Sequence, residues 1–95
     1  METLRPAAVA GLFYPADAMQ LRQLVTTLLE EAAPQPGAPT PKALIVPHAG
    51  CIYSGPIAAS AYAPLMAAAE DIRRVILLGP VHRVPVRGLA LPDTQ

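Results

Sequence analysis

Two apolar stretches that each end on a proline and a histidine limit the possible folds of this chain more than any other feature. The first is ALIVPH (residues 43–48) and the second is VILLGPVH (75–82), and they hold both histidines of the 95-residue sequence. Short apolar runs that stop at proline or glycine are typical of buried strands. Strands are therefore expected at 43–46 and 73–78, with a short third strand at 88–91.

Between the first two strands the sequence favours a helix that opens at Gly55-Pro56, because proline is well tolerated at the first helical position. Pro64 should kink or restart this helix near Ala63. Strand, helix and strand in this order predict a βαβ unit with parallel strands, and hence an α/β fold.

In such a unit the carboxyl ends of both strands lie at one edge of the sheet, where open α/β sheets hold their ligands. His48 and His82 follow these two ends, so their imidazoles could share one metal ion. The alternative is two unrelated histidines, one in a turn and one on the surface. Two histidines are also an incomplete site, since transition metals take three or four protein ligands.

The first third of the chain is predicted to be one helix with an irregular segment before it. Residues 1–16 show no regular pattern, and Asp17 with Gln20 has the spacing of a helix N-cap. Apolar residues then recur at helical spacing: Leu21, Leu24, Val25, Leu28, Leu29 and Ala32. Residues 33–42 are rich in proline and predict an extended linker.

The composition indicates a chain that does not bury its own apolar surface. Hydrophobic residues make up 53% and charged residues only 15%, with a mean hydropathy of +0.36, whereas about 25% charged residues is usual. Either another polypeptide covers this surface, or the chain is one piece of a larger domain. An exposed sheet edge would then allow oligomerisation.

Several functional classes are excluded by charge and hydropathy. The net charge is zero and no basic block is present, so nucleic-acid binding is not expected. The N-terminus has no signal-peptide core and no apolar run is long enough to span a membrane. A single cysteine allows no internal disulfide, and a cytoplasmic location is expected.

Other side chains near the histidines are candidates for a pocket. Cys51 can be a small buried residue, a metal ligand, or a reactive thiol paired with His48 as a hydrolase nucleophile. Tyr14 and Tyr53 can offer hydroxyl groups or simply pack.

The remaining candidates are glycines, a proline and two arginines. The glycines at 50, 55 and 79 are expected in turns that need unusual backbone angles, with Gly50, Gly79 and Pro80 beside the pocket. Arg83 and Arg87 can attract an anionic substrate or be solvated surface.

Three motifs taken together, AGLFYPAD, VPHAGCIYSGPIAASAY and LLGPVHRVPVRGLALPD, resemble the Memo family, in particular its microbial branch named AmmeMemoRadiSam system protein B. The resemblance implies an α/β fold similar to class III extradiol dioxygenases, which are non-haem iron enzymes. It also implies that His48 and His82 are metal ligands. The position after P-H-A-G is usually aromatic in the family and is Cys51 here.

The resemblance implies that this chain is the N-terminal part of a single Memo-like domain. It would comprise an N-terminal segment with a helix (1–32), a linker (33–42) and a βαβ unit with histidine-bearing loops (43–95). In the family the third metal ligand, a cysteine or a carboxylate, lies in the C-terminal part, beyond Gln95.

Two functions from different classes are therefore expected. One is a metal-dependent dioxygenase or redox enzyme, with iron(II) as the expected ion and zinc or copper as alternatives. The other is a non-enzymatic module with a vestigial pocket that binds a peptide or a partner. The family name implies AMMECR1-domain and radical S-adenosylmethionine proteins as partners. The small-molecule or peptide ligand itself is not identified by the sequence.

Overall fold

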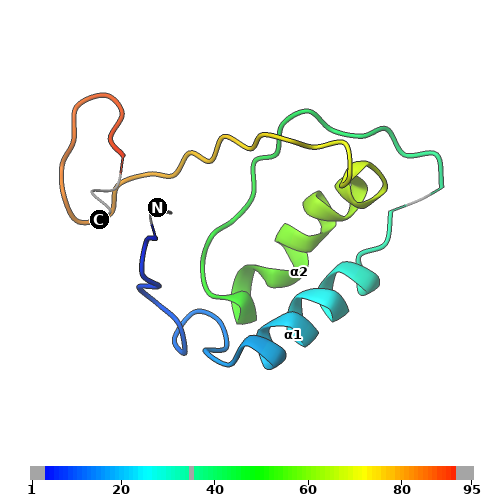
Figure 1. Cartoon of the computed structure of the whole chain (residues 1–95), viewed down its shortest axis with the longest axis horizontal. Coiled ribbons are helices and arrows are strands. Elements are labelled where there is room, and N and C mark those ends of the chain that lie inside the picture. The colour runs from blue at the N-terminus through cyan, green and yellow to red at the C-terminus, as the bar shows by residue number, and fades with distance from the viewer. Residues whose placement is uncertain (1–3, 35, 92–95) are drawn as a thin grey trace. The chain divides into compact units, whose positions relative to one another are not determined.

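The computed structural model describes residues 4–34 and 36–91, and its regular elements are helical. They are α1 (Ala18–Glu31), α2 (Cys51–Tyr62) and the 3₁₀ helix η1 (Ala63–Ala68) (Figure 1). The chain divides into two compact units, one formed by Val9–Arg73 and the other by the N-terminal residues up to Ala8 together with those from Arg74 onward. All three helices belong to the first unit.

The start of α1 confirms the predicted cap. Asp17 has an extended backbone, and its carboxylate accepts a hydrogen bond of 2.9 Å from the backbone N–H of Gln20. This bond satisfies one of the N–H groups that have no partner in the first turn of a helix. The predicted apolar face of α1 is half-buried, with Val25 more exposed than its neighbours, and no residue of this helix is fully buried.

The second helix begins earlier than predicted, at Cys51 instead of Gly55-Pro56, so that Pro56 lies inside it. The physical reason is that the first N–H groups of α2 have acceptors. Cys51 donates to the carbonyl of Phe13, a residue far away in the sequence, at 2.8 Å. Tyr53 and Ser54 both donate to the carbonyl of Gly50 at 2.9 Å. The loss of one hydrogen bond at Pro56 is tolerated in a helix whose start is secured in this way.

The predicted interruption at Pro64 is confirmed. The α-helix ends at Tyr62 and the chain continues as η1, with Pro64 in the first turn of that 3₁₀ helix. Proline at this place costs no hydrogen bond that the new helix would otherwise make.

The predicted α/β fold with a βαβ unit is wrong for this chain. Within the described residues no strand forms, and the sole β-type pairing is an isolated bridge between Ala10 and Tyr14. The segments 43–46, 73–78 and 88–91 have no regular structure, and Leu77 is 85% exposed. The expected open sheet edge, and the dioxygenase-like sheet that the family resemblance implied, are therefore absent from these residues as well.

The difference between the helices and the expected strands has a simple cause. A helix forms its backbone hydrogen bonds within one segment, whereas a strand needs a second strand beside it. Apolar character favours burial but supplies no such partner, and residues 74–78 remain exposed.

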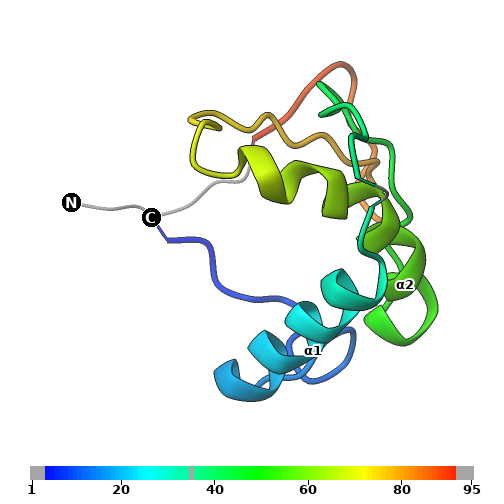
Figure 2. The same ribbon diagram turned by 90° about the vertical axis from the view of Figure 1, so that its right-hand side faces the viewer.

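The hydrophobic core of the helical unit lies between α1 and α2 and is small. The two helices lie side by side (Figure 2), and α2 also contacts η1. At the contact, a Cβ atom on Gly55 would lie 2.9 Å from Cδ1 of Leu28. The absence of a side chain at Gly55 therefore lets α1 approach α2 closely. The buried hydrophobic side chains among the described residues are Ala59 and Ala63.

Candidate functional site

The loop that carries His48 is held by a side chain of the following helix. The backbone N–H of Ala49 donates a 2.9 Å hydrogen bond to Oγ of Ser54. Ser54 lies within α2 and is only 7% exposed. A buried hydroxyl with one fixed partner restrains the backbone directly after His48. This backbone is therefore held at a defined place beside the first turn of α2.

The same loop is also attached to the N-terminal part of the helical unit. Besides the bond from Cys51 to the Phe13 carbonyl, a Cβ atom added to Gly50 would lie 3.5 Å from Cα of Phe13. The backbone of Gly50 therefore runs against the backbone of Phe13. Segments that are far apart in the sequence, AGLFYP and PHAG, are in this way joined at the start of α2.

Residues 9–14 form a tight turn that presents the Phe13 carbonyl. Gly11 has φ of +82°, a left-handed conformation that favours glycine. Its N–H donates to the carbonyl of Tyr14 at 2.7 Å, and the N–H of Phe13 donates to the carbonyl of Val9 at 2.9 Å. The turn thus has its own hydrogen bonds, independent of the loop that it supports.

The two histidines lie in different compact units. His48 is exposed and belongs to the helical unit, whereas His82 is exposed and belongs to the other unit. The strands that were expected to bring them together do not form, so a shared metal ion remains a prediction. Among the described residues, no group of three or more His, Cys, Asp or Glu side chains could hold a metal ion.

A cavity of about 400 Å³ brings together two of the predicted pocket residues, Tyr14 and Cys51. Phe13 and Leu24 also line it, which places this cavity between the N-terminal turn and the helices. Cys51 is a half-buried free thiol and lines a second cavity between α1 and α2 as well.

The other predicted pocket residues lie outside these cavities. Tyr53 points from α2 into solvent and is exposed, and Gly50 packs against Phe13. Gly79 and Pro80 are exposed in the other unit.

The predicted need for unusual backbone angles at three of the glycines is wrong. Glycines with positive φ in the described residues are Gly11, Gly37 and Gly88. Gly50 instead has φ of −55°, which any residue adopts. Gly55 is explained by its close approach to Leu28.

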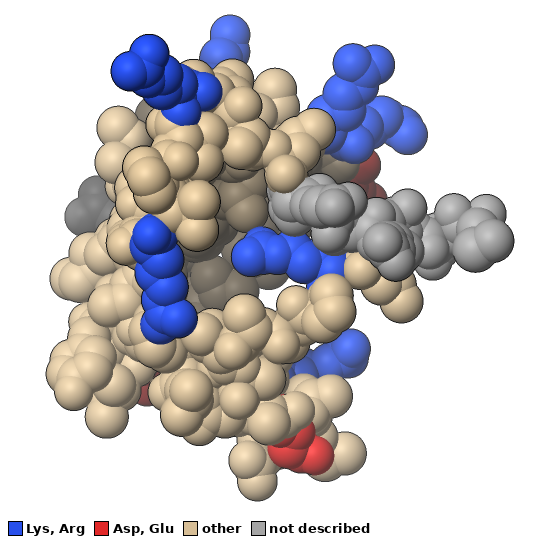
Figure 3. Space-filling model, turned by 90° about the vertical axis from the view of Figure 1, so that its left-hand side faces the viewer, with Lys and Arg blue, Asp and Glu red and all other residues tan. Residues whose placement is uncertain are grey.

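Figure 3 shows Lys and Arg side chains in blue among mostly uncharged residues in tan. Arg83 and Arg87 are both exposed.

Sequence reasoning missed Ser54 and the Phe13 carbonyl, the two groups that hold the histidine loop. A helix start at Gly55 left Ser54 outside the helix, with no reason to contact the loop. Had the helix been placed from Cys51, Ser54 would lie in its first turn, where serine side chains commonly bond to nearby backbone groups. The Phe13 carbonyl leaves no signal in residue type, because any residue carries one.

A model of the family described as Memo-like protein matches residues 5–94 of this chain. The chain belongs to the Memo family. The protein memo-1 homolog of Caenorhabditis elegans is 40% identical over 90 residues, which are 95% of this chain and 25% of that protein. A MEMO1 family protein of Aquifex aeolicus is 44% identical over 79 residues, 83% of this chain and 27% of that protein. Protein MEMO1 of Danio rerio is 40% identical over 91 residues, 96% and 29% respectively.

The chain therefore spans less than a third of the length of these Memo-family relatives. No solved structure shows significant similarity to it. In the part of the chain that the structure describes, neither helix has the length and apolar character to cross a membrane.

Proposed function

We propose that this Memo-family chain contributes His48 and His82 to a transition-metal pocket. A further ligand, from outside this sequence, completes the pocket. The observation that carries the proposal is the family match, which extends over residues 5–94 and so includes both histidines. Imidazole nitrogens are common ligands of iron, zinc and copper. The restrained loop around His48 supports the assignment, because a ligand on a fixed backbone loses less freedom when it binds.

The residues present fit part of a metal site and not a whole one. Their donor chemistry is suitable. Within residues 4–34 and 36–91, however, no group of three or more His, Cys, Asp or Glu side chains could hold a metal ion. A site of two histidines and one anionic ligand with open positions is the arrangement of many non-haem iron oxygenases. A bound iron(II) ion would supply redox chemistry toward O₂ and an oxidisable substrate such as a catechol.

The described residues restrain the backbone beside one of the two proposed ligands, His48. Ser54 accepts the N–H of Ala49 and Phe13 accepts the N–H of Cys51, on either side of Gly50. These two bonds fix the backbone that follows His48 and direct it into α2. They act on the position of the histidine and need no participation of Ser54 in chemistry.

The test is a cobalt(II) titration of the chain, followed by the visible absorption of the metal and by calorimetry. We expect weak binding, which His48→Ala and His82→Ala each reduce about tenfold or more. Cys51→Ser serves as the control and should change the affinity less than about twofold, since the thiol is not one of the proposed ligands. Equal affinity in both histidine variants and the wild type would contradict the proposal.

The finer proposal, a dioxygenase-like activity, requires a separate measurement. Under anaerobic conditions iron(II) is added to a complete Memo-family protein that contains this sequence, and O₂ is then admitted with a catechol. Consumption of O₂ that depends on His48 supports an oxidative enzyme. Metal binding without O₂ consumption would indicate a pocket that binds and does not oxidise.

A further inference from the structure

Gly11 stands at the centre of the turn of residues 9–14. Its φ of +82° is left-handed, a conformation that glycine adopts about as readily as the right-handed one. A Cβ atom at this position would lie 3.7 Å from Cβ of Ala16, which is an ordinary van der Waals contact. The space around Gly11 would therefore admit a side chain, and it is the backbone conformation that restricts the residue at this position.

The conformation of Gly11 determines where the carbonyl of Phe13 lies. The backbone of Ala10 pairs with that of Tyr14 in an isolated bridge, and the N–H of Gly11 donates to the Tyr14 carbonyl at 2.7 Å. Both interactions close the chain across residues 11–14, so a change in the φ of Gly11 would separate their partners. Phe13 lies within the closed segment, and the direction of its carbonyl follows from the closure.

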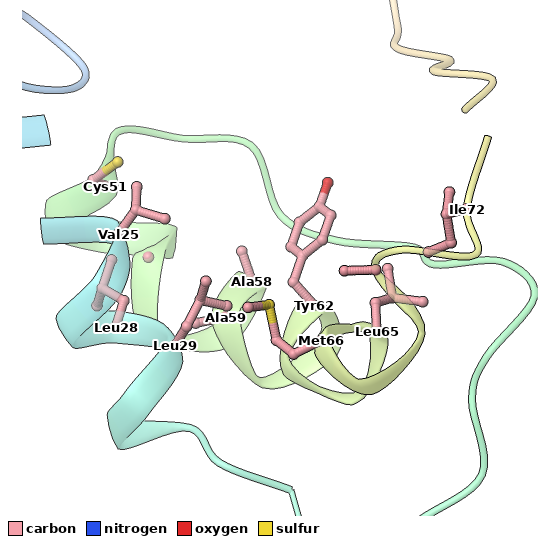
Figure 4. Close-up of a pocket in the computed structure, with 12 residues that line it drawn as sticks. Val25, Leu28, Leu29, Cys51, Ala58, Ala59, Tyr62, Leu65, Met66 and Ile72 are labelled. Carbon is pink, nitrogen blue, oxygen red and sulfur yellow. The ribbon is translucent and has the colours of Figure 1, made fainter. Parts of the chain in front are cut away.

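The Phe13 carbonyl in turn fixes the residue at which α2 begins. It accepts the N–H of Cys51 at 2.8 Å, three positions after His48. The side chain of Cys51 lies at the start of α2 and lines the cavity between α1 and α2 together with Val25 (Figure 4). The backbone of Cys51 is therefore the link between the turn and the loop that carries His48.

We propose that Gly11 is a positioning residue for the metal pocket. Its left-handed conformation places the Phe13 carbonyl, and this carbonyl holds the His48 loop through the N–H of Cys51. The inference rests on the proposed function for the role of His48 as a ligand. A loop that is held in place before binding loses less freedom when its ligand binds, so the affinity for the metal depends on Gly11 although this residue carries no side chain.

Gly37 provides a matched control in the same compact unit. Its φ is +83°, nearly that of Gly11, and no heavy atom of the described residues lies within 4 Å of a Cβ atom placed on it. An L-residue with a Cβ atom populates the left-handed conformation less by a factor of roughly 5 to 30. Gly11→Ala and Gly37→Ala therefore impose the same backbone strain, the first in the turn that supports the histidine loop and the second in the proline-rich linker.

Amide hydrogen exchange in the presence of a chelator tests the positioning without any metal. We expect Gly11→Ala to accelerate exchange of the Cys51 amide about fivefold or more relative to the amides of α1, and Gly37→Ala to change this ratio less than about twofold. Gly11→Asn should have a smaller effect than Gly11→Ala, since asparagine tolerates the left-handed conformation. If the alanine variant does not fold, Gly11→Asn is compared with Gly37→Asn in the same way. Equal ratios at the two positions would overturn the inference, and so would an acceleration that the amides of α1 share.

A cobalt(II) titration of the same variants then connects the turn to the pocket. Gly11→Ala should lower the affinity about threefold or more, because only molecules with the loop in place are competent to bind, and Gly37→Ala should leave it unchanged. Faster exchange at Cys51 with an unchanged affinity would overturn the role of Gly11 in metal binding. A wild-type chain that binds no cobalt(II) would contradict the proposed function and this role together, while the exchange ratio decides separately whether Gly11 positions the loop.

Discussion

The two compact units of this chain both contain apolar runs but differ in structure. The unit Val9–Arg73 forms two α-helices and a 3₁₀ helix, whereas the residues from Arg74 to Leu91 have no regular structure. Along one side of each helix, apolar residues of α1 and α2 pack within their own unit, whereas those of 75–78 remain exposed. Hydrophobicity alone does not decide whether a segment acquires structure; a hydrogen-bonding partner of suitable geometry is needed as well.

The largest expected effect is a charge placed between the two helices. Ala59 is 5% exposed and lies on the surface of α2 that faces α1. Ala59→Glu should lower the free energy of unfolding of the helical unit by about 3 kcal/mol, because a buried carboxylate has no partner there. Thermal unfolding followed by circular dichroism measures this effect. Ala67→Glu, at an exposed position of η1, is the control and should cost less than about 0.5 kcal/mol.

A double-mutant cycle tests the contact between Gly55 and Leu28. Gly55→Val should destabilise the unit by about 2 kcal/mol, since even a Cβ atom would meet the Leu28 side chain at 2.9 Å. In a Leu28→Ala background the same substitution should cost less than about 1 kcal/mol. Additive effects in urea unfolding would show that the two side chains do not limit the approach of the helices.

Loss of the Ser54 hydroxyl tests the support of the histidine loop. Ser54→Ala leaves the N–H of Ala49 without its 2.9 Å partner and should cost about 1 to 1.5 kcal/mol. The exchange of the Ala49 amide hydrogen, measured by NMR, should become faster in the same variant.

Ser60→Ala is the matched control in the same helix. The Ser60 hydroxyl donates to the Ile57 carbonyl but is exposed, so its removal should change stability by less than about 0.5 kcal/mol. Equal losses from the two serine variants would argue against a special role of Ser54.

The smallest effect is expected in the unit that lacks helices. Leu77→Glu replaces a large apolar side chain that is 85% exposed, so unfolding of the helical unit should change by less than about 0.5 kcal/mol. Solubility should increase, because an exposed apolar side chain is removed. A loss of 2 kcal/mol or more, on the order of a core substitution, would show that the segment is packed and that the contrast between the two units is wrong.

Features encoded by neighbouring residues were predictable from the sequence, and features that depend on distant partners were not. The cap at Asp17 and the restart at Pro64 each depend on residues within one turn, and both were confirmed. The start of α2 was placed too late because it depends on Phe13. The strands were predicted from apolar runs, yet strand formation requires a partner that the run itself does not specify.

The same distinction applies to the candidate site. The motif around His48 could be identified by its residues, and together with AGLFYPAD and the motif around His82 it predicted the family, which the match over residues 5–94 confirms. The pairing of His48 with His82 was inferred from a sheet that does not form in these residues, so it now depends on the family assignment alone.

The bond between Cys51 and Phe13 has a consequence for how the chain can be shortened. A variant that begins after residue 14 would lack the carbonyl that receives the Cys51 amide. Its second helix would then fray back toward Pro56, the first position at which a missing amide hydrogen is harmless to a helix start. The thirteenth residue of the polypeptide thus governs the length of a helix that begins thirty-eight positions downstream (51 minus 13).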